Sequence, residues 1–240
     1  MNKVSGEKTS QIHYHLRFQI IPGRNVERDA RILAKFCKDH SIEEVVLFFA
    51  AEEWNNGLLS SKEENQWFDT VKRTKSVLDK DGLTVSLNPW MTVLAGARGR
   101  RFPNDRKFKP AVSPYGEKSK ACASFADKEW QRYIYNLYGR FARLGFRVIW
   151  VEDDFRYHNH GPLSWGSGFE PDVISRFAKK IKRKVTREEI VRNILKPGKP
   201  HHWRAKCMET WNEIQLEVAK GFSKAVSKNA PGKTKLGLMS

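Results

Sequence analysis

The chain has 240 residues, of which 40% are hydrophobic and 30% are charged, so it can bury a core and does not have the composition of a disordered protein. Its apolar runs are shorter than the roughly 18 residues that span a bilayer, and its N-terminus lacks a signal-peptide core. The three cysteines are widely spaced, which is typical of reduced thiols rather than a disulfide framework. We therefore expect a cytoplasmic protein with no membrane partner.

Apolar segments typical of strands alternate along the chain with amphipathic segments typical of helices. Strands are predicted at 12–21, 45–51, 83–88, 147–152 and 235–239. Helices are predicted at 26–40, 61–81, 172–181, 186–195 and 203–227, and one more begins at Asp127. A long loop rich in Gly, Pro and basic residues is predicted at 91–125. Ser61 with Glu64, and Thr186 with Glu189, have the spacing of capping boxes.

The alternation of strands and helices predicts an α/β fold with a parallel sheet and right-handed crossovers. No glycine-rich fingerprint follows the first or second strand, which argues against a dinucleotide-binding fold. We therefore predict a (β/α) TIM-type barrel in which about five of the eight strands are present. In this interpretation residues 1–11 form a flexible N-terminus, residues 12–240 form a truncated partial barrel, and the unpaired barrel edges favour oligomers.

Three consecutive acids, Glu152, Asp153 and Asp154, follow the apolar strand near 147–152. Carboxylates at the exit of a parallel strand are typical of catalytic sites in α/β proteins, and they serve as general acids, general bases or nucleophiles. Strand alternation places Glu152 and Asp154 on the face of Trp150, and Asp153 on the other face. Alternation loosens at a strand end, so all three remain catalytic candidates. The alternative for each acid is an ion pair with Arg156 or a helix cap.

The other strand ends carry acids, amides and indoles. Because the carboxyl ends of the strands meet at one mouth of a parallel barrel, these groups are expected to share one site. Indole rings stack on the apolar faces of sugars, and amides and acids bind sugar hydroxyls. The predicted substrate is therefore a carbohydrate. The predicted substrate-binding residues are Glu52, Glu53, Trp54, Asn55, Asn88, Trp90, Arg156, His158, His160 and Trp165.

No metal ion or other cofactor is expected. His158 and His160 have the spacing of a metal-ligand pair, but this spacing alone is a weak signal, and a loop that contacts substrate is the more ordinary interpretation. His13 and His15 open the first strand and therefore lie at the end of the barrel that serves stability. Cys122 is interpreted as a packing residue rather than a nucleophile.

The net charge is +17, and much of it lies in two clusters. A solvated basic surface and a surface that binds nucleic acid or another anionic polymer are both compatible with this charge. The alternative function is therefore a basic binding or structural module on a partial α/β barrel, with only weak, non-specific polyanion binding expected. The clusters are Arg98, Arg100, Arg101, Arg106, Lys107 and Lys109, and Arg176, Lys179, Lys180, Lys182, Arg183, Lys184 and Arg187.

Five motifs together resemble the catalytic domain of bacterial β-galactosidase-like glycoside hydrolases, which are TIM-barrel enzymes of a retaining clan. They lie at residues 52–55, 86–90, 150–160, 162–166 and 236–240. The resemblance implies an acid/base carboxylate at the end of strand four and a nucleophile at the end of strand seven. It therefore implies that the chain is the N-terminal part of such a domain, and that on its own it lacks turnover.

The sequence departs from this family at two places. Relatives often carry a cysteine pair after a Trp-Gly dipeptide, sometimes linked to a metal, whereas Trp165-Gly166 is followed here by Ser-Gly-Phe-Glu. The Asn-Glu that is usual at strand four is replaced by Glu152-Asp153-Asp154. The first departure argues against a metal at this loop, and the second leaves the choice of the acid/base residue open.

Overall fold

Five parallel strands form one sheet in the computed structural model, which describes residues 13–50, 58–90, 101–152, 155–157 and 163–239. Every neighbouring pair of strands is parallel, and the order across the sheet follows the chain. This confirms the predicted strand order and shows an α/β fold in the form of a partial barrel. The strands are β1 (His15–Gln19), β2 (Glu44–Phe49), β3 (Thr84–Pro89), β6 (Val148–Val151) and β7 (Lys235–Leu238).

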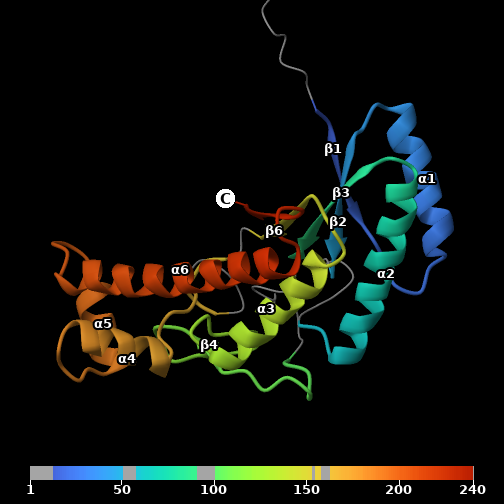
Figure 1. Cartoon of the computed structure of the whole chain (residues 1–240). Helices are drawn as coiled ribbons and strands as arrows, with labels where there is room; N and C mark the ends of the chain where they lie inside the picture. The colour runs from blue at the N-terminus through green and yellow to red at the C-terminus, as the bar shows by residue number, and fades with distance from the viewer. Residues whose placement is uncertain (1–12, 51–57, 91–100, 153–154, 158–162, 240) are drawn as a thin grey trace, which may run out of the picture.

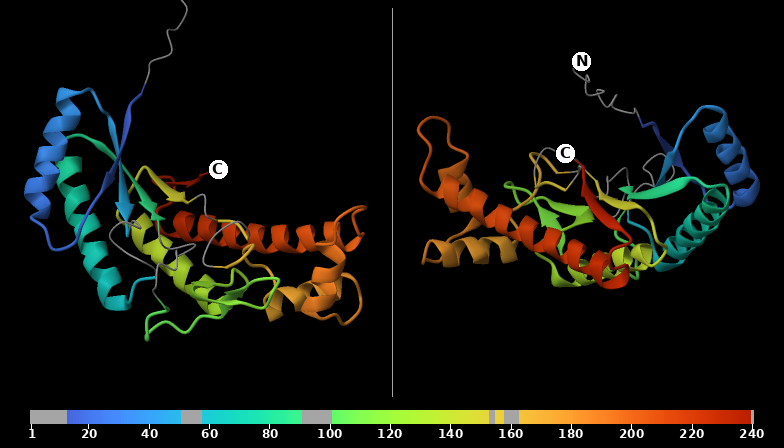
Figure 2. Two further views of the ribbon diagram at one scale, coloured as in Figure 1. Left: turned by 180° about the vertical axis from the view of Figure 1, so that it is seen from behind. Right: turned by 45° about the horizontal axis from the view of Figure 1, so that its top comes forward.

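Four helices cover one face of this sheet, and two more lie away from it along the last helix (Figures 1 and 2). The covering helices are α1 (Val26–Asp39), α2 (Ser61–Lys80), α3 (Lys128–Ala142) and α6 (Trp203–Asn229). The two short helices, α4 (Pro171–Lys180) and α5 (Arg187–Ile194), pack against α6. Among the described residues, no helix has the length and apolar character that a membrane crossing requires.

The core lies between the sheet and the covering helices. Leu47, Phe49 and Ile149 point to this side of their strands and are fully buried. Phe49 contacts Trp67 of α2 and Phe141 of α3, with ring centroids 5.9 Å and 4.9 Å apart. Because side chains alternate along a strand, the intervening residues point to the opposite face of the sheet, which is the inner face of the partial barrel.

The capping box of α2 lies one residue earlier than predicted. Ser60, rather than Ser61, is the N-cap, and its side chain accepts a hydrogen bond from the backbone of Glu63 while Glu63 bonds back to Ser60. At the start of α5 the predicted cap is present, since Thr186 accepts from the backbone N–H of Glu189. The shift at α2 turns Glu64 away from the cap and into the protein, where it is buried.

A β-hairpin occupies part of the predicted loop at 91–125. Its strands, β4 (Pro110–Val112) and β5 (Lys118–Ala123), are antiparallel and form a separate two-stranded sheet. The turn has Ser113 first, Pro114 second and Gly116 fourth, and the Gly116 N–H donates to the Ser113 carbonyl at 3.0 Å. These are favoured residues for a type I turn, so the sequence did carry a local signal for the hairpin.

Candidate active site

A row of side chains crosses the inner face of the sheet at the level of Asn88. The strand register aligns Gln19 with Phe48 and Phe48 with Asn88, and the pairing of Leu87 with Ile149 puts Trp150 at the same level. Trp150 in turn aligns with Gly237 of β7, where an added Cβ would lie only 2.3 Å from the indole. A glycine at this position therefore makes room for the Trp150 ring on the inner face.

The side chains of Asn88 and Glu152 meet at the carboxyl end of the sheet, and we call them the strand-end pair. The Asn88 Nδ2 donates to the Glu152 Oε2 at 2.5 Å, and both side chains are buried. The Met239 Sδ lies 3.8 Å from the same nitrogen. Two residues that the sequence assigned to one site, from strands 64 residues apart in the chain, are thus in direct contact. Glu152 shares the face of Trp150, as strand alternation predicted.

Three buried polar atoms of side chains in this row have no hydrogen-bond partner within the described parts of the chain. They are the Gln19 Nε2, the Asn88 Oδ1 and the Trp150 Nε1. Buried polar groups in proteins are almost always satisfied, so unsatisfied ones need an explanation. Two of these atoms donate and one accepts, and the Glu152 carboxylate contacts the side chain of Asn88. This combination suits a ligand that both donates and accepts hydrogen bonds, such as one rich in hydroxyl groups.

The other described candidates lie in two different surroundings. Trp90 is partly buried beside Phe48, with ring centroids 5.2 Å apart, and the guanidinium of Arg17 lies 5.6 Å from the Trp90 ring. Trp165 has a positive φ of 75° and packs near Trp211 of α6, with centroids 6.0 Å apart. The structure thus groups Trp90 with the first two strands and Trp165 with α6.

Arg156 is half-buried and directly precedes the buried Tyr157. Several further predicted site residues, as well as the predicted flexible N-terminus at 1–11, lie outside the described residues. Their roles stay predictions, and these residues are Glu52, Glu53, Trp54, Asn55, Asp153, Asp154, His158 and His160.

Glu170 is a buried carboxyl group that the sequence analysis missed. It stands just before α4 and accepts hydrogen bonds from the backbone N–H groups of Val112 (3.0 Å) and Gly168 (3.3 Å). Burial raises its pKa to about 7, and these two bonds only partly oppose the rise. Its Oε2 has no partner among the described residues, and neither does the buried hydroxyl of Tyr157. A carboxyl that titrates near neutral pH is a candidate proton donor or acceptor.

The N-terminal ends of the strands, opposite the strand-end pair, hold a second group of polar side chains. The Glu44 carboxylate is buried and contacts the His15 Nδ1 at 2.9 Å, the Ser86 hydroxyl at 2.5 Å and the guanidinium of Arg147. His13 pairs with Glu43. Within the described ranges, no group of three or more His, Cys, Asp or Glu residues could hold a metal ion. With its cationic and hydroxyl partners, Glu44 has the contacts of a structural carboxylate.

Several residues of the two basic clusters form ion pairs with acidic side chains of the same chain. Arg176 contacts Glu217 at 2.8 Å, Lys180 contacts Glu213 at 2.5 Å, and Arg187 contacts Glu188 at 2.6 Å. In the first cluster, Lys109 contacts Asp172 and Arg106 contacts the buried Glu64, whereas Arg98 and Arg100 lie outside the described residues. Much of the charge that suggested a polyanion surface is therefore neutralised locally.

Comparison with solved structures identifies the architecture. The chain is similar to the catalytic domain of β-amylase from Paenibacillus polymyxa (TM-score 0.59, 10% identity), with 94% of this chain and 65% of that chain covered. It is similar to a β-galactosidase from Bacillus circulans sp. alkalophilus, with a TM-score of 0.60 and 13% identity, over 95% of this chain and 36% of that chain. The chain is also similar to the PgaB glycoside hydrolase domain from Bordetella bronchiseptica, with a TM-score of 0.60 and 14% identity, over 95% of this chain and 65% of that chain.

These likenesses show a fold shared with TIM-barrel glycoside hydrolases. The chain spans between about one third and two thirds of the length of these structures. Its sequence matches no family model and no curated protein.

Proposed function

We propose that this chain binds carbohydrate at the carboxyl end of its sheet and supplies the acid/base carboxyl group of a glycoside hydrolase. The observation that carries the proposal is the strand-end pair together with the unpartnered buried atoms in the same row on the inner face of the sheet. A sugar hydroxyl can accept from the Trp150 Nε1 and donate to the Asn88 Oδ1 at the same time. The fold shared with glycoside hydrolases supports the same conclusion.

In the proposed chemistry, one acid of Glu152, Asp153 and Asp154 protonates the glycosidic oxygen as its bond to the anomeric carbon breaks. A second carboxylate, which the resemblance to β-galactosidases assigns to strand seven, bonds to that carbon in the same step. Water then displaces this second carboxylate and gives its proton to the acid/base carboxylate, which completes a retaining mechanism. Asn88 holds the Glu152 carboxylate at a fixed place on the inner face. Glu152 is thereby either the acid itself or the residue that binds a sugar hydroxyl beside it.

Binding by the chain itself is the first test. We expect β-galactosides to bind in isothermal titration calorimetry, and Asn88→Ala and Glu152→Gln to weaken binding about tenfold or more, because each removes one hydrogen bond or charge at the site. Glu213→Gln is the matched control, since it makes the same chemical change on an exposed position of α6 that lines neither proposed site. Absence of binding to any glycoside, or equal binding by all variants, would contradict the proposed site.

The role of the acid is tested by kinetics, in any form of the protein that turns over aryl glycosides. Among Glu152→Gln, Asp153→Asn and Asp154→Asn, one variant should lower kcat by about 100- to 10,000-fold on substrates with poor leaving groups. The same variant should be much less impaired on dinitrophenyl glycosides, whose leaving group needs no proton. If all three variants keep the wild-type rate, the acid/base residue lies elsewhere.

A further inference from the structure

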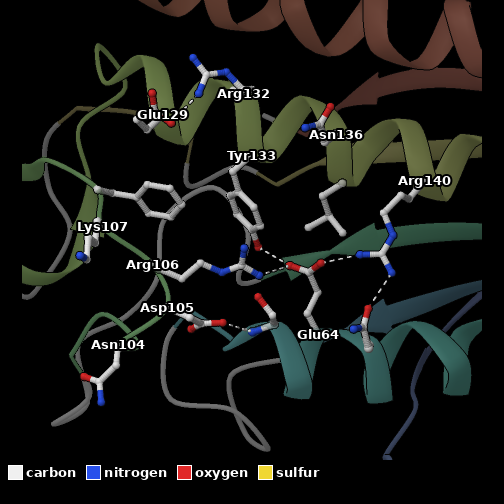
Figure 3. Close-up of a pocket in the computed structure, with 14 residues that line it drawn as sticks. Glu64, Asn104, Asp105, Arg106, Lys107, Glu129, Arg132, Tyr133, Asn136 and Arg140 are labelled. Carbon is white, nitrogen blue, oxygen red and sulfur yellow. Dashed lines mark hydrogen bonds and ion pairs between the residues drawn. The ribbon is translucent and has the colours of Figure 1, made fainter.

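A pocket lies between α2 and α3 (Figure 3). Its volume is about 800 Å³, which is in the range of small-molecule sites. The start of α2, one side of α3 and the segment at 104–108 form its walls. Neither Asn88 nor Glu152 lines it, so any ligand bound here would be independent of the proposed active site.

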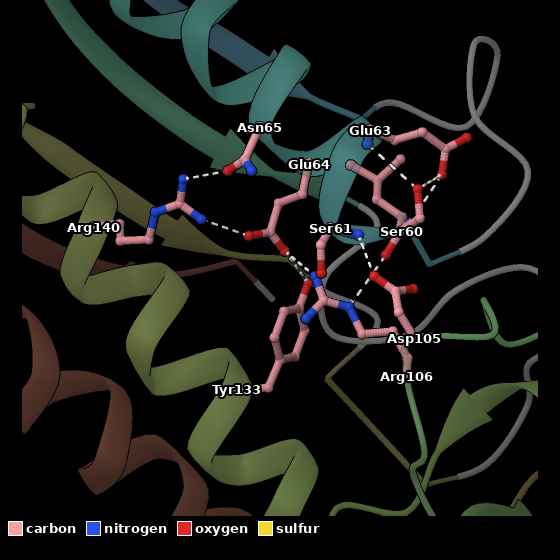
Figure 4. Close-up of polar contacts among 10 residues, drawn as sticks. Ser60, Ser61, Glu63, Glu64, Asn65, Asp105, Arg106, Tyr133 and Arg140 are labelled. Atoms are coloured by element: carbon pink, nitrogen blue, oxygen red, sulfur yellow. Dashed lines mark hydrogen bonds and ion pairs between the residues drawn. The ribbon is translucent and has the colours of Figure 1, made fainter.

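The floor of this α2–α3 pocket is a buried carboxylate, and both of its oxygens accept hydrogen bonds (Figure 4). Glu64 accepts from Arg106 at 2.9 Å, from the Tyr133 hydroxyl at 2.8 Å and from Arg140 at 2.6 Å. Burial raises the pKa of Tyr133 well above its ordinary value, so its hydroxyl stays protonated and donates. Arg140 also donates to the Asn65 Oδ1 at 2.9 Å. We call this set of contacts the Glu64 network.

The charged side chains that line the pocket are four bases and three acids, which leaves one net positive charge. Arg132 pairs with Glu129 at 2.5 Å. Arg106 and Arg140 both pair with Glu64, so these three side chains together carry one positive charge. Asp105 accepts from the Ser61 backbone N–H at 2.8 Å. Lys107 is exposed and has no ion-pair partner in the part of the chain that the structure describes. Such a surplus of positive charge favours an anionic group, because carboxylates bind guanidinium and ammonium groups through charge-assisted hydrogen bonds.

Aromatic rings and amides line the rest of the α2–α3 pocket. Phe108 lies beside Tyr133 with ring centroids 5.4 Å apart, and the guanidinium of Arg106 covers the Tyr133 ring at 4.3 Å. Asn104 and Asn136 are exposed and lie on opposite walls (Figure 3). The Phe108 ring combined with the amides suits a ligand with apolar C–H groups and several hydroxyls. A simple inorganic anion has no use for either feature.

We propose that the α2–α3 pocket binds an acidic saccharide as a second, non-catalytic carbohydrate site. The carboxylate of the sugar contacts Lys107 and the N–H groups of Arg106 and Arg140 that the Glu64 network leaves over, and its hydroxyls contact Asn104 and Asn136. The Glu64 network holds the two guanidinium groups in place before the ligand arrives, which lowers the entropy cost of binding.

The probe is trigalacturonate, titrated calorimetrically into the chain at 150 mM NaCl. Its fully methyl-esterified form keeps the sugar rings and removes the charge, and citrate keeps the carboxylates and removes the sugar. The variants are Lys107→Glu and Asn136→Ala, because both residues are exposed and lie outside the Glu64 network. Lys199→Glu, in the exposed connection between α5 and α6, is the matched control for the loss of positive charge.

We expect trigalacturonate to bind, and to bind about tenfold more weakly to each pocket variant while Lys199→Glu binds like the wild type. The methyl ester and citrate should each bind at least about tenfold more weakly than trigalacturonate. No binding, equal binding of the ester, or equal binding of citrate would each overturn the proposal. An equal loss in Lys199→Glu would also overturn it, since binding would then reflect the overall charge. Failure here leaves the strand-end proposal untouched, because binding of β-galactosides is measured separately.

Discussion

Two buried glutamates in this protein are stabilised in opposite ways. Glu64, in the α2–α3 pocket, accepts hydrogen bonds from two guanidinium groups and a phenol. Glu170, at the junction of the hairpin and α4, accepts only from two backbone N–H groups, and one of its oxygens has no partner within the described residues. Both side chains are nearly inaccessible to solvent, so burial alone does not distinguish them.

The difference is whether a positive charge accompanies the carboxylate into the protein. Taking an ionised carboxylate out of water costs several kcal/mol unless charge and hydrogen bonds replace the water. At Glu64 two arginines supply that charge. At Glu170 the cost is relieved by binding a proton instead, which is why its pKa rises to about 7. One carboxylate is thus tied into a structural network, and the other is available for proton chemistry.

Removal of Glu64 should have the largest effect. Glu64→Ala leaves two guanidinium groups close together with no carboxylate between them, and breaking a buried pair in this way typically costs about 3–5 kcal/mol. Urea unfolding at pH 7 measures the change in the free energy of unfolding. Glu129→Ala is the control, because its exposed pair with Arg132 should contribute less than about 1 kcal/mol. A similar small loss for both variants would show that the Glu64 network does not hold the fold.

Glu170 should make stability depend on pH. Its pKa rises from 4.5 in the unfolded chain to about 7 in the folded protein, so the folded state binds the proton more tightly. The resulting stabilisation is complete below pH 4.5 and is lost as the pH rises through 7, a change of about 3 kcal/mol. Glu170→Gln cannot ionise and should lack this loss.

Urea unfolding of both proteins at pH 5 and pH 8 tests this, because other titrating groups contribute equally and cancel in the difference. The variant should therefore gain stability relative to the wild type as the pH rises. Equal pH dependence of the two proteins would mean that Glu170 does not carry the buried proton.

The fold was largely predictable from the sequence because its signals are local. Apolar segments marked all five strands, of which β2 and β6 are continuous apolar runs. Strand ends pointed to Asn88 and Glu152, which the structure brings into contact. The roles of the two buried glutamates were not predictable in this way. Arg106 and Arg140 lie 42 and 76 residues from Glu64 along the chain, and a one-residue error in the cap assigned Glu64 to the wrong contact.

Glu170 was missed for a related reason. It is buried under a hairpin strand, β4, whose Val112 lies 58 residues away and belonged to a segment predicted as a loop. A loop gives no reason to expect a buried carboxylate beside it. Sequence patterns therefore gave the sheet and its end, whereas the partners of charged side chains depended on tertiary packing between distant segments.

Two matched tyrosine substitutions give the smallest and sharpest test of the comparison. Tyr133→Phe and Tyr157→Phe each remove one buried hydroxyl oxygen, so the change in packing volume is the same in both. The Tyr133 hydroxyl donates to the charged Glu64, and its loss should destabilise the protein by about 2 kcal/mol. The Tyr157 hydroxyl has no hydrogen-bond partner among the described residues, so its removal should be neutral or stabilise the protein by up to about 1 kcal/mol.

Urea unfolding at one pH gives the change in the free energy of unfolding for each variant. Changes of opposite sign would show that the two sites differ in how their polar groups are satisfied, because both substitutions remove the same atom. Equal destabilisation would mean that the Tyr157 hydroxyl donates to an acceptor in solution. Glu170, whose charge raises the pKa of Tyr157, is the first candidate. In that case the pH 5 and pH 8 measurements decide the matter, because an interaction with the ionised carboxylate would make Tyr157→Phe more costly at pH 8 than at pH 5.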